Sequence, residues 1–111
     1  MKGMRIMCFD TIPAKYICNY INKASCVIVD LREPAEFCSN HIPTAINIPY
    51  GQINDYTRYL CSYQEVVLYC ARGNASLLAA RYLNLGNTKV YNVYGGLQAY
   101  RGELVRGTNN I

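Results

Sequence analysis

Residues 65–76 of the chain read EVVLYCARGNAS, and this stretch decides the fold. Its first part, residues 66–69, is a continuous apolar run that ends at Cys70. An uninterrupted apolar run of this length is typical of a strand that is buried on both faces of a parallel sheet. Residues 76–85 then place Leu78, Tyr82 and Leu85 on one helical face, and Gly86 is a helix stop. The stretch therefore predicts a strand, a short loop and a helix in direct succession.

Strands and helices alternate in the same way along the rest of the chain. A second apolar run, residues 26–29, ends at Asp30 and predicts another buried strand. The shorter predicted strands are residues 5–9, 45–48 and 89–93. The other predicted helices are one capped by Thr11 with Pro13 in its first turn, one that starts at Pro34, and residues 54–61 and 97–104. This alternation predicts a three-layer α/β domain with a mainly parallel sheet and right-handed crossovers.

Composition limits the chain to one small globular domain. Of 111 residues, 51% are hydrophobic and 16% are charged, which is too apolar for a disordered chain. We expect residues 1–104 to form the domain and residues 105–111 to form a polar tail. Apolar runs stay far below the roughly 20 residues of a membrane span, so we expect no membrane insertion. The net charge of +4 is spread without a basic block, so it favours anionic small molecules and does not indicate nucleic acid binding.

The six cysteines are interpreted as free thiols. The N-terminal segment reaches Asp10 before an apolar region of secretory length has formed, so we expect a cytoplasmic protein with reduced cysteines. Cysteine pairs with Cys-x-x-Cys spacing are absent, and His41 is the single histidine, so a metal site is not expected. Most of the cysteines are expected to be small core residues. Cys70 differs because it follows the most apolar strand and precedes a glycine-containing loop.

The loop after this strand is the candidate site. Ligand sites in parallel sheets lie beyond the carboxyl ends of the strands, and Cys70 lies at such an end. Backbone N–H groups of the loop and the N-terminus of the next helix would face the sulfur and favour the nucleophilic thiolate. Arg72 supplies a cation, Gly73 permits a tight turn, and Ser76 is a candidate cap for the helix. The candidate binding loop is Ala71, Arg72, Gly73, Asn74, Ala75 and Ser76.

Four motifs, in order, resemble those of the rhodanese (sulfurtransferase) family in its single-domain form. Residues 29–32, followed by Glu36 and Phe37, are similar to the family's Asp-x-Arg…Glu-Phe segment. Residues 41–49 read HIPTAINIP and are similar to its His-Ile-Pro-Gly-Ala-x-Asn-Ile-Pro signature. Cys70 with Gly73 and Ser76 resembles the active-site loop, and residues 95–97 resemble a late Gly-Gly turn. The resemblance extends from the first strand to about residue 104.

The resemblance implies a five-stranded parallel sheet flanked by helices and a covalent sulfur-transfer reaction. Cys70 would attack the outer sulfur of thiosulfate or of a persulfide donor, and would pass the sulfur from its own persulfide to cyanide or a thiol. The N–H groups of residues 71–76 would hold the negative charge. Asp30, Arg32 and His41 are expected to support the site as a hydrogen-bond network and an ordered turn, without acting as acids or bases. The resemblance implies that neither a metal nor an organic cofactor is required.

The chain departs from the family pattern at four positions. Glycines usual in the signature are replaced by Asn40 and Thr44, and the β-branched Thr44 disfavours a left-handed backbone, which predicts a reshaped turn. Ala75 stands where many short members have arginine, and Tyr100 where a tryptophan is common. With Ala75, Arg72 is the chief candidate for binding an anionic donor, and slow turnover of thiosulfate is expected.

Other functions are less well supported by the residues. A phosphatase or arsenate reductase of the Cys-x5-Arg type needs arginine at position 76, which is Ser76. A non-catalytic module that binds a partner or senses redox state remains the alternative function. A third possibility is a carrier that receives its sulfur from a protein persulfide. Cys61 would resolve a persulfide as a disulfide only if its Cα lay about 5.5–6 Å from that of Cys70.

Overall fold

A computed structural model of the protein describes residues 9–108. Five parallel strands form one sheet in the order β1-β5-β4-β2-β3. The strands are β1 (Phe9–Pro13), β2 (Cys26–Asp30), β3 (Ile46–Asn47), β4 (Glu65–Tyr69) and β5 (Lys89–Tyr94). The central strands β2 and β4 are buried along almost their whole length, as their continuous apolar runs predict. The expected five-stranded parallel sheet is therefore confirmed.

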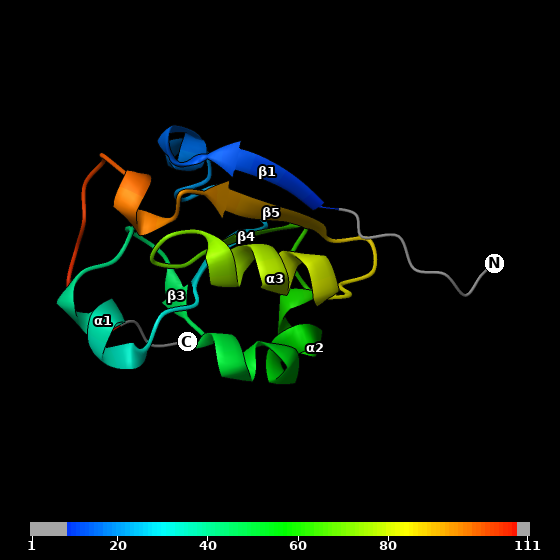
Figure 1. Cartoon of the computed structure of the whole chain (residues 1–111). Coiled ribbons are helices and arrows are strands. Elements are labelled where there is room, and N and C mark those ends of the chain that lie inside the picture. The colour runs from blue at the N-terminus through cyan, green and yellow to red at the C-terminus, as the bar shows by residue number, and fades with distance from the viewer. Residues whose placement is uncertain (1–8, 109–111) are drawn as a thin grey trace.

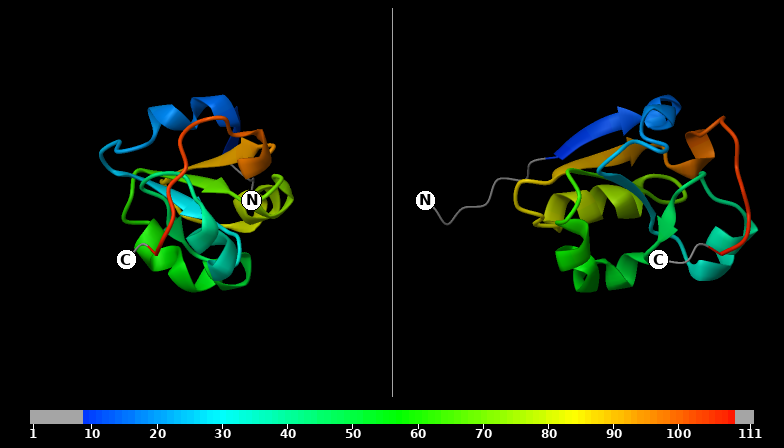
Figure 2. Two further views of the ribbon diagram at one scale, coloured as in Figure 1. Left: turned by 90° about the vertical axis from the view of Figure 1, so that its left-hand side faces the viewer. Right: turned by 180° about the vertical axis from the view of Figure 1, so that it is seen from behind.

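Helices cover both faces of the sheet, which gives three layers (Figures 1 and 2). The α-helices are α1 (Pro34–Ser39), α2 (Thr57–Leu60) and α3 (Asn74–Tyr82). The 3-10 helices are η1 (Ala14–Asn19), η2 (Tyr50–Tyr56) and η3 (Leu97–Ala99). In Figure 1 the carboxyl ends of β1 and β5 point to the left, toward α1 and η3. That end of the sheet is where a ligand site is expected in a parallel α/β fold.

Alternate residues of each strand belong to two separate cores. Val66 and Leu68 of β4 pack in a cluster with Ala79 and Ala80 of α3 and with residues of η2 and α2. Val67 and Tyr69 of the same strand face the other way, in a cluster with residues of η1 and α1. Because β4 contributes to both cores, its position and that of the residue after it are tightly fixed.

The predicted helix N-terminus at Thr11 is wrong. Thr11 lies within β1, where it is paired with Asn92 of β5. Pro13 is the last residue of this strand, and the helix begins at Ala14 as a 3-10 helix. Proline adopts an extended backbone readily at a strand end, so the residue taken as a helix signal ends a strand instead. Of the predicted strand 5–9, only Phe9 lies within the described residues.

Three further helix predictions need correction. Helix α3 starts at Asn74 and ends at Tyr82, and it packs through Ala79 and Ala80, whereas Leu78 and Tyr82 are exposed. Small residues allow the helix to lie close to the sheet, and a pattern of large apolar residues does not reveal such a face. Predicted helix 54–61 is divided between η2 and α2. Predicted helix 97–104 is limited to η3, since Tyr100 has an extended backbone.

The turn at Thr44 keeps its left-handed conformation. Thr44 has a φ of 70°, so the β-branched residue adopts the left-handed backbone that it was expected to disfavour. Asn40 is extended, with a φ of −170°. After η3 the chain returns to α1, where His41 and Val105 exchange backbone hydrogen bonds of 2.7 and 2.9 Å. Gly107 N–H also donates to the Cys38 carbonyl at 3.0 Å.

Candidate active site

Cys70 directly follows β4, and its thiol faces the start of α3. The side chain is buried, with 5% of the residue surface exposed. Its Sγ accepts hydrogen bonds from the backbone N–H groups of Gly73 at 3.1 Å and Ser76 at 3.3 Å. These N–H groups lie at the N-terminus of α3, where the helix has unpaired donors and a partial positive charge. The geometry stabilises negative charge on the sulfur.

The loop is held in this shape by one glycine within it and another that packs against it. Gly73 is the N-cap of α3 and has a φ of 104°, which a residue with a Cβ rarely adopts. Gly96, in the turn after β5, lies so close to the loop that a Cβ would be 2.5 Å from the Cys70 carbonyl oxygen. This approach lets Leu97 N–H donate to that carbonyl at 2.8 Å. The Gly-Gly turn therefore supports the Cys70 loop directly.

Ser76 is part of the sulfur environment and is not the helix cap. It is the third residue of α3, whereas Gly73 occupies the N-cap position, so the predicted capping role is wrong. Cys70 S–H can donate to the fully buried Ser76 Oγ at 3.6 Å. The Ser76 hydroxyl in turn has Asn92 Oδ1 at 2.6 Å and the Gly73 carbonyl oxygen at 3.2 Å as acceptors. A buried chain thus runs from the thiol through Ser76 to β5.

The sulfur opens into a hollow of about 320 Å³, which we call the Cys70 hollow. Its charged lining consists of Arg72 from the loop and Arg32, Glu33 and Glu36 at the start of α1. Glu33 and Glu36 form a capping box on that helix, in which the Glu33 N–H donates to Glu36 Oε1 at 3.1 Å. The rest of the lining is Leu31, Ala71, Asn74 and Ala75. Arg72 is the exposed cation of this lining.

Asp30 and Arg32 form a buried ion pair beside the site. The Arg32 Nη2 lies 2.9 Å from Asp30 Oδ2, and the same arginine donates to the Asn40 carbonyl oxygen. Burial lowers the pKa of the Arg32 guanidinium, but the hydrogen bond and charge of Asp30 outweigh burial, so its pKa is raised. Asn47 donates to the carbonyls of residues 30 and 32 at 3.0 and 2.9 Å. The pair holds the segment between β2 and α1 in place.

His41 is buried away from the sulfur. Its ring stacks on Phe37 with a centroid distance of 3.8 Å, and its Nδ1 lies 2.8 Å from the Phe37 carbonyl oxygen. The next residue, Ile42, donates its N–H to the hydroxyl of Tyr69 at 3.1 Å. Burial, followed by the charge of Asp30, raises the pKa of Tyr69. The histidine segment thus joins α1 to the end of β4.

The remaining described cysteines lie elsewhere in the fold. Cys61 lies at the end of α2, before β4, while Cys70 lies after it. A five-residue strand is about 17 Å long, so the two residues are too far apart for a disulfide. Cys26 lies at the start of β2, and burial raises the pKa of its thiol to about 11. Among residues 9–108, we find no group of three or more metal-ligating side chains.

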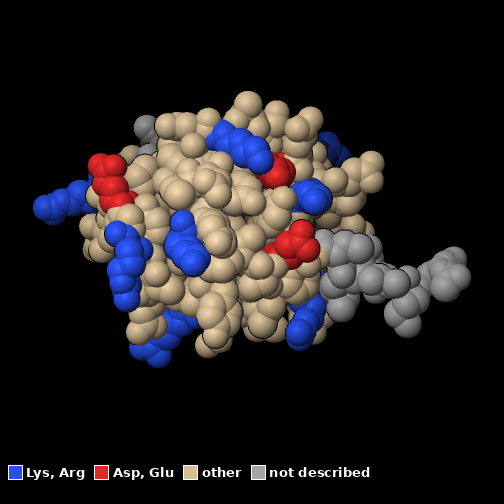
Figure 3. Space-filling model, turned by 90° about the horizontal axis from the view of Figure 1, so that it is seen from above, with Lys and Arg blue, Asp and Glu red and all other residues tan. Residues whose placement is uncertain are grey.

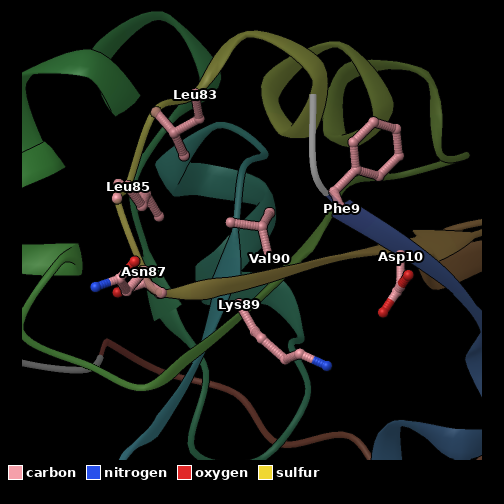
Figure 4. Close-up of a pocket in the computed structure, with 9 residues that line it drawn as sticks. Phe9, Asp10, Leu83, Leu85, Asn87, Lys89 and Val90 are labelled. Atoms are coloured by element: carbon pink, nitrogen blue, oxygen red, sulfur yellow. The ribbon is translucent and has the colours of Figure 1, made fainter. Parts of the chain in front are cut away.

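A larger hollow lies at the opposite end of the sheet (Figure 4). It encloses about 440 Å³ and is lined by Phe9 and Asp10 of β1, Lys89 and Val90 of β5, and residues after α3. These residues are at the amino ends of the strands, about 20 Å of strand away from the Cys70 loop. The described lining contains no cysteine, so this hollow is not part of the candidate site.

The sequence predictions missed the place of three residues at the site, Asn92, Glu33 and Glu36. Asn92 was included only as part of a strand, although a polar residue within the run VYNVY is a signal of a buried hydrogen bond. Glu33 and Glu36 flank Pro34 in a recognisable helix start, but only the fold places them in front of Cys70. The sequence therefore contains no signal that Glu33 and Glu36 lie in front of Cys70.

Comparisons with known proteins identify the family. A family model described as the rhodanese-like domain matches residues 14–103. The thiosulfate sulfurtransferase GlpE of Pseudomonas syringae pv. syringae is 37% identical over 82 residues, which cover 73% of this chain and 77% of that protein. The putative sulfurtransferase YtwF of Bacillus subtilis is 34% identical over 76 residues, covering 68% of this chain and 74% of that protein. The chain belongs to the rhodanese-like domain family.

Solved structures agree with this assignment. The crystal structure of a rhodanese-like domain protein from Staphylococcus aureus matches with a TM-score of 0.74 at 27% identity, covering 88% of this chain and 98% of that chain. A thiosulfate sulfurtransferase from Pseudomonas aeruginosa shares the fold, with a TM-score of 0.76 at 19% identity, and covers 96% of this chain and 21% of that chain. Within residues 9–108, no helix is long and apolar enough to cross a membrane.

Proposed function

We propose that the protein is a sulfurtransferase that works through a persulfide on Cys70. The observation that supports this most strongly is the buried sulfur with two backbone N–H donors at 3.1 and 3.3 Å. Donors that are already in place stabilise the charge that develops on sulfur without a cost of reorganisation. The names of the sulfurtransferases at 34–37% identity favour the same chemistry.

In the first half-reaction, the Cys70 thiolate attacks the outer sulfur of thiosulfate. A bond forms between the two sulfurs, the sulfur–sulfur bond of thiosulfate breaks, and sulfite leaves with the electron pair. The Cys70 persulfide then carries the negative charge beside Gly73 and Ser76. In the second half-reaction, cyanide or a thiolate takes the outer sulfur and regenerates the Cys70 thiolate. These steps need no cofactor.

The charge of the Cys70 hollow supports a proposal for the sulfur donor. Arg72 is its exposed cation, Arg32 is paired with Asp30, and Ala75 adds no charge. Glu33 and Glu36 oppose the binding of a dianion such as thiosulfate. We therefore propose that thiosulfate is a slow donor and that a protein persulfide is the faster one. We also propose a cytoplasmic location, since a reducing compartment keeps the Cys70 thiol free.

A steady-state assay tests the function with a matched pair of variants. Thiosulfate and cyanide are supplied, and the formation of thiocyanate is followed for wild type, Cys70→Ser and Cys61→Ser. We expect Cys70→Ser to abolish turnover with the fold intact, while Cys61→Ser, at the other end of β4, retains wild-type turnover. Arg72→Ala is expected to raise the KM for thiosulfate. Turnover that survives in Cys70→Ser contradicts the proposal.

The alternative, a non-catalytic module, makes the opposite prediction. Such a module would form no persulfide with thiosulfate or with a cysteine desulfurase persulfide as the donor. The loop geometry favours catalysis over this alternative, because Gly73, Ser76 and the Gly96 contact all serve to hold donors around the sulfur.

A further inference from the structure

A second hollow adjoins the Cys70 loop on the other side of Arg72. It encloses about 340 Å³, and its lining includes Arg32, Asn40, Arg72, Leu97, Gln98 and Leu104. We call it the Leu104 hollow. Arg32, Ala71 and Arg72 line both hollows, so these three residues form the wall between them. Cys70 lines only the Cys70 hollow.

The two hollows differ in charge. The described lining of the Leu104 hollow contains no Asp or Glu, whereas Glu33 and Glu36 line the Cys70 hollow. Within residues 9–108, the salt bridges are Lys23–Glu65 and Arg32–Asp30, so the Arg72 guanidinium is not paired with a carboxylate. A cation in this position is available to an anionic ligand.

A second arginine adds to the positive charge at this place. Arg101 is exposed, and its Nη1 donates to the backbone oxygen of Gln98, a residue of the lining, at 3.1 Å. In Figure 3, Lys and Arg side chains lie at the left-hand end of the molecule, toward which the carboxyl ends of the strands point in Figure 1, with an acidic side chain among them, and other Lys and Arg side chains lie toward the right. The exposed Glu103, next to Leu104 in the chain, offsets part of this charge, and Arg72 and Arg101 leave the surroundings of the hollow positive on balance.

The shape of this region indicates the length of the ligand. Arg72 separates the Leu104 hollow from the sulfur of Cys70. A single small thiol is therefore too short to occupy the Leu104 hollow and the Cys70 hollow at the same time. An extended peptide advances about 3.3 Å per residue, so a cysteine and a carboxylate a few residues apart do span them. Leu104, which is 40% exposed, offers an apolar contact for such a peptide.

We propose that the Leu104 hollow binds an acidic segment of a polypeptide sulfur acceptor. An Asp or Glu of this segment pairs with Arg72 or Arg101 while a nearby cysteine enters the Cys70 hollow. The inference rests on the sulfurtransferase function proposed above. The acceptor thiolate attacks the outer sulfur of the Cys70 persulfide and forms a persulfide on the acceptor. The old sulfur–sulfur bond breaks, and its electron pair returns to Cys70 as a thiolate, so no external oxidant or reductant is required.

Binding of two labelled decapeptides tests the proposal without sulfur chemistry. Both have a serine in place of the acceptor cysteine, and it is flanked by Glu in one peptide and by Lys in the other. Fluorescence anisotropy at low salt is expected to show at least fivefold tighter binding of the acidic peptide, with the difference shrinking in high salt. Equal affinities for the two peptides overturn the proposal.

A pair of charge variants separates the hollow from the net charge of the protein. Gln98→Glu places a carboxylate at the Leu104 hollow, whereas Gln64→Glu makes the same change on an exposed residue before β4, at the opposite end of the sheet. We expect Gln98→Glu to weaken binding of the acidic peptide about threefold and Gln64→Glu to leave it unchanged. Equal effects of the two variants contradict the inference.

A transfer experiment distinguishes failure of the inference from failure of the function. The protein is loaded with sulfur from thiosulfate, freed of donor and mixed with the cysteine forms of the two peptides. A loaded protein that transfers sulfur equally well to both peptides contradicts the acidic acceptor and leaves the sulfurtransferase function intact. A protein that takes up no sulfur contradicts the thiosulfate reaction, and the anisotropy measurement still decides whether the hollow binds acidic peptides.

Discussion

Replacement of Gly96 by alanine tests whether the turn after β5 holds the catalytic loop in place. A Cβ at this position would lie 2.5 Å from the carbonyl oxygen of Cys70 and 2.8 Å from the carbonyl carbon of Ala71. Ordinary contact begins at 3.4 Å, so the peptide between these residues must retreat by about 0.9 Å. The neighbouring atoms are backbone, so they cannot move aside as a flexible side chain would.

This displacement is expected to slow sulfur transfer by about 100-fold. A misplacement of about 1 Å in a catalytic arrangement has a cost of that order, which corresponds to about 2.7 kcal/mol in the activation free energy. The Gly73 and Ser76 N–H groups then no longer meet the sulfur at their present distances of 3.1 and 3.3 Å. The assay is the single-turnover rate of Cys70 persulfide formation at saturating thiosulfate, with urea unfolding to confirm that the variant is folded.

Gly86→Ala is the matched control. Gly86 has a φ of 63°, close to the 62° of Gly96, but nothing lies within 4 Å of a Cβ there. Gly86→Ala is expected to lose about 1–2 kcal/mol of stability from its positive φ. Gly96→Ala is expected to lose more, because its φ of 62° and ψ of −157° are adopted almost only by glycine and its Cβ meets backbone atoms. The control is expected to keep the wild-type rate of persulfide formation. A Gly96→Ala rate within threefold of wild type, or an equal loss in both variants, would refute the reasoning.

Three other predictions concern stability. Thr44→Gly is expected to raise the free energy of unfolding by about 0.5–1 kcal/mol, because the exposed Thr44 has a φ of 70°, which glycine adopts without strain. Urea denaturation measures this change, and a decrease in the free energy of unfolding would contradict the prediction. Asn92→Leu is expected to lower the free energy of unfolding by about 1 kcal/mol, since the Gly73 carbonyl remains as an acceptor for the Ser76 hydroxyl. A loss above about 3 kcal/mol in the same measurement would contradict this, because it would show that the Ser76 hydroxyl is left unpaired. The hydrogen bond from Lys23 lowers the pKa of Glu65 below 4.5. The ionised Glu65 therefore stabilises the folded protein above pH 4.5, and this stabilisation is lost as the pH falls through the lowered pKa. Unfolding measured from pH 6 to pH 3 is expected to be less pH-dependent in Glu65→Gln than in wild type, and parallel curves would contradict this.

The two central strands were predictable because their signal is local. Residues 66–69 and 26–29 are continuous apolar runs, and both are buried strands at the centre of the sheet. Helix ends were less predictable. Thr11 and Pro13 have the residue types of a helix start, but their backbone is paired with β5, so a tertiary contact decides the structure.

The candidate site was predictable as far as neighbours in sequence determine it. Cys70, Gly73 and Ser76 are within seven positions of one another, and the structure brings all three together. Glu33 and Asn92 are far from Cys70 in sequence, and only the order of strands in the sheet brings them to the same end. Residues that set the charge of the site therefore required the fold.

The most direct test of the central claim is the mass of the protein after exposure to a sulfur donor. The intact protein is incubated with thiosulfate, and in parallel with a cysteine desulfurase carrying a persulfide, then digested and mapped before and after cyanide treatment. The persulfide mechanism predicts one added sulfur atom on the peptide that contains Cys70, removed by cyanide and absent from Cys70→Ser. Protein that gains no sulfur from either donor, or gains it only on another cysteine, would contradict the mechanism.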